Sequence, residues 1–233
     1  MTDVSTILTT EDYSQRRTPP ELATWVTDIC NRYSASKEAK EYARLRKGLA
    51  KQFFEEARPL SLLATHLFGS STAVFCQPVL GNQAFDSVIE DHRQGGIVTN
   101  YLECTCAIDG YADHLRMKVL NQKGHVSAYG NVVAKGNKRT GHEIEIDGGA
   151  VSRDELRNRA IALLTKALKG KAERFYGASH WLCVEFDDWI WLRNDDDAVE
   201  IRDTLADFRA ALALDFGRVF ILGSSGKLVW DLR

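Results

Sequence analysis

The amino-acid sequence predicts an α/β protein in which a small mixed β-sheet is flanked by helices. Apolar residues make up 44% of the 233 residues, which is enough for a buried core without disulfides or a structural metal. Apolar side chains recur at helical spacing from Leu22 to Phe68 and again after Ser152, whereas short β-type runs lie between Ala73 and Cys106. This change of period along one chain predicts helices packed on a sheet.

The charge balance, the hydropathy and the cysteines indicate which classes of protein and partner are expected. The chain has 30 basic and 32 acidic residues, so a contact with nucleic acid would have to come from a local patch. No apolar run approaches the roughly 20 residues that span a bilayer, and residues 1–17 lack the apolar core of a signal peptide. The five cysteines are odd in number and well spread, as in a reduced cytosolic protein. We therefore expect a cytoplasmic protein with no membrane partner, a flexible tail over residues 1–17 and a single domain over 18–233.

Three helical stretches are expected before the sheet. Thr18 to Glu21 form a capping box with prolines in the first turn, which predicts the start of the first helix. The other two are expected over about 37–57, interrupted at Arg58-Pro59, and over 60–68, stopped by Gly69.

Three short strands should follow in close succession, which indicates a meander. They are expected at 73–76, 85–89 and 98–106. A polar insertion at about 107–150 comes next, with a helix over 109–123 stopped by Gly124 and a hairpin of strands 126–134 and 143–146.

The C-terminal third should contain two helices, a buried strand and a hairpin. Ser152 to Glu155 form a second capping box, which opens a long amphipathic helix that Gly177 should close. The remaining elements are expected to be a strand over 181–186, a helix over 199–214 closed by Gly217, and a hairpin of strands 219–222 and 227–230.

Polar side chains follow one face of the strand expected over 98–106. Because side chains alternate along a strand, one face should pack in the core with its apolar members, Leu102, Cys104 and Cys106. The opposite face carries Tyr101, Glu103 and Thr105. A carboxylate in such a place is costly unless it is solvated, paired or bound to a metal.

The order of elements between about residues 37 and 186 and two acidic residues carry a family resemblance. With Asp86 in one strand and Glu103-Cys104-Thr105 in the next, the chain resembles the PD-(D/E)XK nuclease-like superfamily, whose restriction-endonuclease-like core has the order αβββαβ. The resemblance implies hydrolysis of phosphodiester bonds in DNA or RNA with Mg²⁺ or Mn²⁺. It assigns Asp86 and Glu103 as catalytic metal ligands and Thr105 as the residue that orients water.

The chain departs from the family pattern at one position, and the resemblance leaves another open. Thr105 stands where the family usually has lysine, and a threonine cannot stabilise a charged transition state electrostatically. A lysine supplied from another element would restore the charge, and the candidates are Lys118, Lys166 and Lys169. The family often adds a carboxylate from the preceding helix, for which Glu55 and Glu56 are the candidates.

The insertion is locally basic, which favours contact with a phosphate backbone. Its candidate nucleic-acid-binding residues are Arg116, Lys118, Lys123, Lys135, Lys138 and Arg139. Basic residues of the following helix extend the patch, namely Arg153, Arg157, Arg159, Lys166, Lys169, Lys171 and Arg174. The alternative is a solvated hairpin that takes part in a homodimer contact.

Two functions remain open from the sequence. One is a metal-dependent nuclease, and the other is a catalytically degenerate nuclease-like fold that acts as a nucleic-acid-binding or protein-interaction module. A purely structural interpretation also stands, in which Asp86 is a turn or edge residue and Glu103 pairs with a basic residue of the insertion. A second candidate cation site lies at the end of a strand, at Glu185, Asp187 and Asp188.

Overall fold

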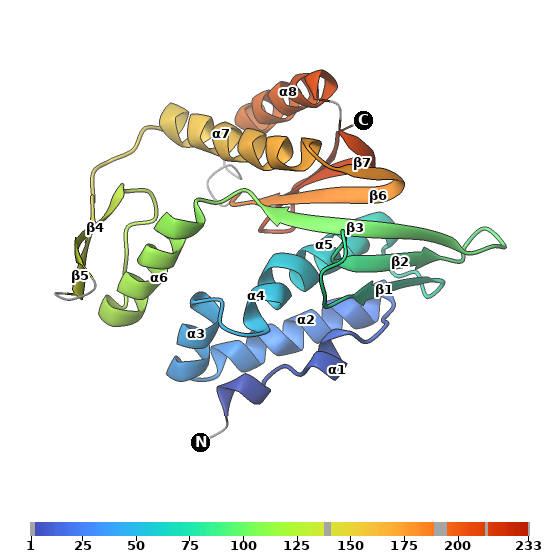
Figure 1. Cartoon of the computed structure of the whole chain (residues 1–233), viewed down its shortest axis with the longest axis horizontal. Coiled ribbons are helices and arrows are strands. Elements are labelled where there is room, and N and C mark those ends of the chain that lie inside the picture. Colours follow the sequence, from blue (N-terminus) through green and yellow to red (C-terminus); the bar gives the residue numbers. More distant parts are fainter. Residues whose placement is uncertain (1–2, 138–140, 189–194, 213, 233) are drawn as a thin grey trace.

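A six-stranded mixed sheet confirms the predicted α/β class (Figure 1). The computed structural model describes residues 3–137, 141–188, 195–212 and 214–232. In spatial order the strands are β1 (Val74–Pro78), β2 (Ser87–Asp91), β3 (Val98–Cys106), β6 (Phe175–Phe186), β7 (Asp215–Gly223) and β8 (Val229–Asp231). The β3–β6 and β6–β7 pairs are parallel and the other three pairs are antiparallel. The predicted meander is therefore β1-β2-β3, and β3 has the predicted bounds.

Helices cover both faces of this sheet (Figure 1). On one face α2 (Pro19–Ser34) and α5 (Arg58–Phe68) pack through the larger of two hydrophobic clusters. On the other face α7 (Arg153–Ala172) and α8 (Asp195–Ala211) pack through the second cluster. Because α7 carries the chain from β3 back to a parallel partner, β6, its last turn passes over β3.

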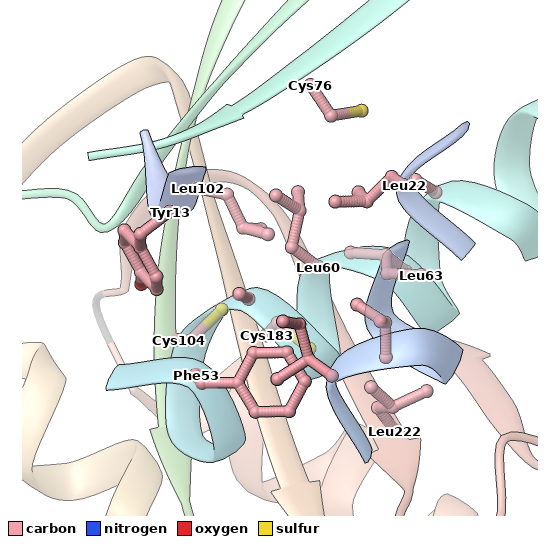
Figure 2. Close-up of a cluster of buried hydrophobic side chains, with 14 of the residues drawn as sticks. Tyr13, Leu22, Phe53, Leu60, Leu63, Cys76, Leu102, Cys104, Cys183 and Leu222 are labelled. Atoms are coloured by element: carbon pink, nitrogen blue, oxygen red, sulfur yellow. The ribbon is translucent and has the colours of Figure 1, made fainter. Parts of the chain in front are cut away.

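The larger cluster joins the N-terminal helices to the middle of the sheet. Figure 2 shows Phe53, Leu60 and Leu63 from the helical layer gathered with Leu102 and Cys104 of β3. Leu102 is fully buried, as strand alternation predicts. This packing fixes β3, and it thereby orients the polar face of the strand toward α7.

The N-terminal segment is not a flexible tail over the residues that the structure describes, so that prediction is wrong. It forms a 3₁₀ turn, η1 (Val4–Thr6), and a short helix, α1 (Thr10–Tyr13). Leu8 and Tyr13 are buried in the larger cluster. The backbone of Arg17 exchanges hydrogen bonds of 2.9 and 2.8 Å with Cys76 of β1, which ties the segment to the edge of the sheet.

The expected long helix over 37–57 is broken earlier than predicted. It divides into α3 (Lys37–Arg44), α4 (Ala50–Gln52) and a π-helical turn, η2 (Phe53–Ala57). The break lies at residues 45–49, where Arg46 and Gly48 have φ of +51° and +49° and end α3. Arg58-Pro59 does not interrupt the chain, because Pro59 lies in the first turn of α5, where a missing N–H is tolerated.

The insertion contains the predicted helix and hairpin. The helix α6 (Gly110–Lys123) is capped by the Asp109 side chain and ends at Gly124, whose φ is +77°. The hairpin strands are β4 (Val132–Asn137) and β5 (Gly141–Ile146), which lie beyond α6 and away from the large sheet (Figure 1). The first strand therefore begins later than predicted, at Val132.

Two glycines predicted to close helices lie in strands instead. The helix α7 ends at Ala172, and Gly177, with φ of +92°, lies at a register irregularity within β6. The Asp215 carboxylate accepts the backbone N–H groups of Tyr176 and Gly177, at 2.9 and 3.0 Å, and so draws this end of β6 onto β7. Gly217 lies in β7 and leaves no room for a side chain beside the Ala178 carbonyl.

The five cysteines form no disulfide, as their number and spread predict. No helix in the described part of the chain is both long and apolar enough to span a bilayer.

Leu102→Ala tests the central position of β3. Removing a fully buried leucine costs about 2–5 kcal/mol of unfolding free energy, because the cavity left behind is only partly refilled. The matched control is Val98→Ala on the same strand, which is 53% exposed and should change stability by about 0.5 kcal/mol or less. Urea unfolding measures both, and equal losses would show that β3 is not anchored at Leu102.

Candidate active site

A cavity of about 530 Å³ opens at the C-terminal end of β3. Figure 1 shows α3, α4 and α6 gathered around that end of the strand. The predicted acidic residues and Thr105 line this single cavity, although they come from three parts of the chain. Its acidic side chains are Glu55, Glu56, Asp86, Glu103 and Asp113.

Asp86 is held against β3 by its backbone and its side chain. It lies one residue before β2, not within it, and its N–H donates to the Leu102 carbonyl at 2.8 Å. Its Oδ2 accepts the N–H of Cys104 at 2.7 Å. Burial, followed by the nearby charge of Glu103, raises the pKa of Asp86 to about 6. The side chain is therefore part of an electrostatic pair and not a solvated edge residue.

Glu103 faces the α7 side of β3 and is 8% exposed. Lys171, in the last turn of α7, donates a hydrogen bond to its Oε1 and forms an ion pair with it. The face predicted for Glu103 is confirmed, because Leu102 and Cys104 point into the core. Cys106 departs from the pattern, since at the end of the strand its thiol meets Glu185 at 3.7 Å and lines the cavity.

Glu56 is the helix carboxylate that lies near the pair. Its Oε2 accepts a hydrogen bond of 2.9 Å from the hydroxyl of Tyr13. Burial, followed by the charge of Asp86, raises the pKa of Glu56 to about 7. Glu55 also lines the cavity, but its carboxylate lies 4.0 Å from the ammonium group of Lys51.

The lysine that reaches the acids is Lys171, which sequence reasoning placed only in a basic patch. The three candidates for this role lie elsewhere. Lys118 is exposed on α6 and does not line the cavity. Lys166 and Lys171 both line a neighbouring cavity of about 210 Å³, and of the two it is Lys171 that contacts Glu103. Lys169 extends over the Phe208 ring of α8, at 5.4 Å from its centroid. No local signal marks Lys171, because its position depends on how α7 crosses β3.

Some basic side chains of the insertion form hydrogen bonds or ion pairs with other residues of the insertion. Arg116 donates a 2.7 Å hydrogen bond to the Gly130 carbonyl, and Lys135 pairs with Glu145 across the hairpin at 2.5 Å. Lys118 and Lys123 are exposed. Lys138 and Arg139 lie outside the described residues. The structure therefore leaves the phosphate-binding role of this patch a prediction.

Part of the patch on α7 is engaged in ion pairs as well. Arg153 and Arg157 both bind Asp197 at the start of α8, and Arg159 binds Glu155 one turn earlier on its own helix. The two contacts with Asp197 join α7 to α8, whereas the Arg159–Glu155 pair lies within α7.

The second acidic cluster, at the end of β6, is held by structural contacts. Glu185 accepts a 2.6 Å hydrogen bond from Arg58 of α5. Asp188 accepts the backbone N–H and the hydroxyl of Ser225 at 2.8 and 2.5 Å, which fixes the turn after β7. These contacts favour a structural role over a cation site.

The Mg²⁺ or Mn²⁺ that the resemblance implies can be tested against the donor set. Oδ2 of Asp86 and Oε1 of Glu103 are engaged, and within the described residues the other oxygen of each carboxylate has no hydrogen-bond partner. No three His, Cys, Asp or Glu side chains of the described ranges are grouped closely enough to hold an ion by themselves. Mg²⁺ commonly takes only one or two carboxylates and keeps several waters, so a two-carboxylate set of this kind fits.

Glu56→Gln tests the buried charges through the pH dependence of stability. Because the pKa of Glu56 in the folded protein is raised to about 7, this group favours folding below its ordinary pKa and loses that contribution as the pH rises through 7. Without divalent ions, Glu56→Gln should raise the melting temperature at pH 8, because it removes a buried negative charge. The rise should be about 2–4 °C for each kcal/mol by which the charge destabilises the folded protein, and at pH 4.5 the melting temperature should change little.

The control for that comparison is Glu11→Gln, at an exposed carboxylate of α1. It should leave the pH profile of the melting temperature as in the wild type. A Glu56→Gln difference of the same size at pH 4.5 and pH 8 would show that the charge of Glu56 is not the cause.

Comparison of the chain with protein-family models, with curated proteins and with solved structures gave no match. The chemistry of the cavity is therefore argued from its own residues, above all from the ion pair of Glu103 with Lys171 beside Asp86.

Proposed function

We propose that this protein is a metal-dependent nuclease of PD-(D/E)XK type, which hydrolyses phosphodiester bonds of DNA or RNA. The observation that carries the proposal is the ion pair of Lys171 with Glu103, whose side chain lines one cavity together with Asp86. It supplies a lysine to a site whose strand motif has Thr105 in the lysine position. Two acids and a lysine are the minimum set that the resemblance implies.

Each residue of the cavity has a distinct part in the proposed reaction. Asp86 and Glu103 would hold Mg²⁺ or Mn²⁺, which supplies a water of lowered pKa and stabilises charge on the phosphate. Lys171, which pairs with Glu103 from the neighbouring cavity, would add a positive charge near the phosphate oxygens on which negative charge develops. The hydroxyl of Thr105 would orient the water, and Glu56, which lines the same cavity and has a pKa near 7, would accept its proton.

A second candidate function is a catalytically degenerate module that binds nucleic acid or protein. One observation favours it: among the described residues no three potential ligands are grouped around a common point. In that case Lys171 only neutralises a buried carboxylate. The basic insertion would then carry the binding, or a homodimer contact.

Glu103→Gln and Lys171→Met test the proposed function. The wild type should cut single- or double-stranded DNA or RNA with Mg²⁺ or Mn²⁺ and not with EDTA. Glu103→Gln should lower the cleavage rate by at least about 10²-fold while strand binding is kept or tightened, because a negative charge near phosphate is removed. Lys171→Met should cost about 10²–10³-fold, as does the loss of one group that stabilises transition-state charge.

The matched control is Lys169→Met, an exposed lysine of the same helix, which should cleave like the wild type. Melting temperatures of all variants separate loss of chemistry from loss of folding. A purified wild type that binds strands but cuts none with either metal would favour the degenerate module. Equal losses in Lys169→Met and Lys171→Met would contradict the role given to Lys171.

A further inference from the structure

Three basic side chains line the same cavity as the acids: Arg44, Arg46 and Lys51. Two of them have polar partners. Arg44 donates a 3.1 Å hydrogen bond to Asn121 of α6, and Lys51 lies 4.0 Å from Glu55. The guanidinium of Arg46 lies over the Phe54 ring, 4.6 Å from its centroid, and among the described residues no carboxylate lies within ion-pair distance of it.

The positive charge of Arg46 changes the pKa values of two groups that line the cavity. It opposes the rise that burial causes in the pKa of Asp113, and it does the same for the Cys106 thiol. Both residues line the cavity. The guanidinium is therefore close enough to act on a ligand there, and its five donors are not committed to a protein anion.

Arg46 occupies a backbone position that normally belongs to glycine. The N–H groups of Arg46 and Lys47 bond to the carbonyls of Ala43 and Tyr42, at 3.0 and 3.2 Å, which is the pattern of a Schellman motif at the end of α3. Arg46 is the residue in the left-handed position, and it is the one non-glycine with positive φ in the described part of the chain. The helix end would be satisfied better by glycine, so the arginine side chain serves something other than the turn.

We infer that Arg46 binds a phosphate of the substrate strand, next to the phosphate that the proposed metal site of Asp86 and Glu103 would cleave. This inference rests on the proposed function, and it adds a phosphate site on the loop over residues 45–49. A guanidinium matches the oxygens of a phosphodiester with two parallel hydrogen bonds. The Phe54 ring lies on one side of the guanidinium, 4.6 Å from its central carbon, and restricts the freedom of the side chain.

Arg46→Gly distinguishes phosphate binding by Arg46 from a role of Arg46 in folding. The variant should bind the strand more weakly but be at least as stable as the wild type. The probe is a fluorescently labelled dT12 or U12 strand, and the dissociation constant is measured by anisotropy in EDTA and in Ca²⁺. We expect the dissociation constant to rise about tenfold, as for loss of one charge-assisted contact. The slope of log K against log salt should become shallower by about 0.7, which corresponds to one phosphate contact on a single strand. The melting temperature should be unchanged or rise by up to about 3 °C, because the left-handed strain is removed.

Two further variants make the comparison specific. Lys47→Ala removes a neighbouring charge that is exposed and does not line the cavity, and it should bind within twofold of the wild type. Arg46→Lys keeps the charge without the planar fork, so it should keep the salt slope and lose part of the affinity.

Several outcomes would overturn the inference. These are wild-type affinity in Arg46→Gly, an equal loss in Lys47→Ala, a lower melting temperature that accompanies the loss of binding, or no strand binding by the wild type at low salt. The proposed function fails separately. If the wild type binds the strand through Arg46 but never cleaves it, the Arg46 phosphate site stands and the proposed nuclease activity is rejected. If Arg46→Gly cleaves with an unchanged KM, the nuclease activity stands and the Arg46 phosphate site is rejected.

Discussion

The cost of keeping the carboxylates of Glu56, Asp86 and Glu103 close together in one part-buried cavity is the constraint on which the rest of the site depends. Burial disfavours the ionised form of a carboxyl group and nearby like charges add to this cost, so the pKa values of Asp86 and Glu56 are raised. Each acid has one compensating partner, and each partner comes from a different element. The Cys104 N–H of β3 supports Asp86, the Tyr13 hydroxyl of α1 supports Glu56, and Lys171 of α7 supports Glu103.

This arrangement ties the site to parts of the fold that lie far apart in the sequence. Tyr13 is buried in the larger hydrophobic cluster, and its hydroxyl links the N-terminal segment to Glu56 of the cavity. Lys171 is placed by the buried stripe of α7, where Leu168 and Leu164 pack in the second cluster one and two turns earlier. The ion pair of Lys171 with Glu103 consequently depends on how α7 packs across β3. A change in either hydrophobic layer would alter the geometry of the acids.

The sequence predicted those features that depend on local pattern. Alternation along residues 98–106 gave the bounds of β3 and the opposite faces of Leu102 and Glu103, and the Thr18 capping box gave the start of α2. It could not predict features set by contacts across the fold. The burial of Tyr13 and the choice of Lys171 over Lys118, Lys166 and Lys169 depend on helix docking. The end of α3 at Arg44 was missed because Arg46, a non-glycine residue, takes the left-handed position that usually marks such an end.

The most direct test of the account is to locate bound Mn²⁺ by its anomalous scattering in crystals of the full-length protein grown above pH 7 with millimolar Mn²⁺. Above pH 7 both Asp86 and Glu56 should be ionised, since their pKa values are about 6 and 7. The account predicts an anomalous peak within coordination distance of the Asp86 and Glu103 carboxylates, with Lys171 still beside Glu103. Absence of a peak there at full Mn²⁺ loading, or a peak at another group of residues, would contradict it.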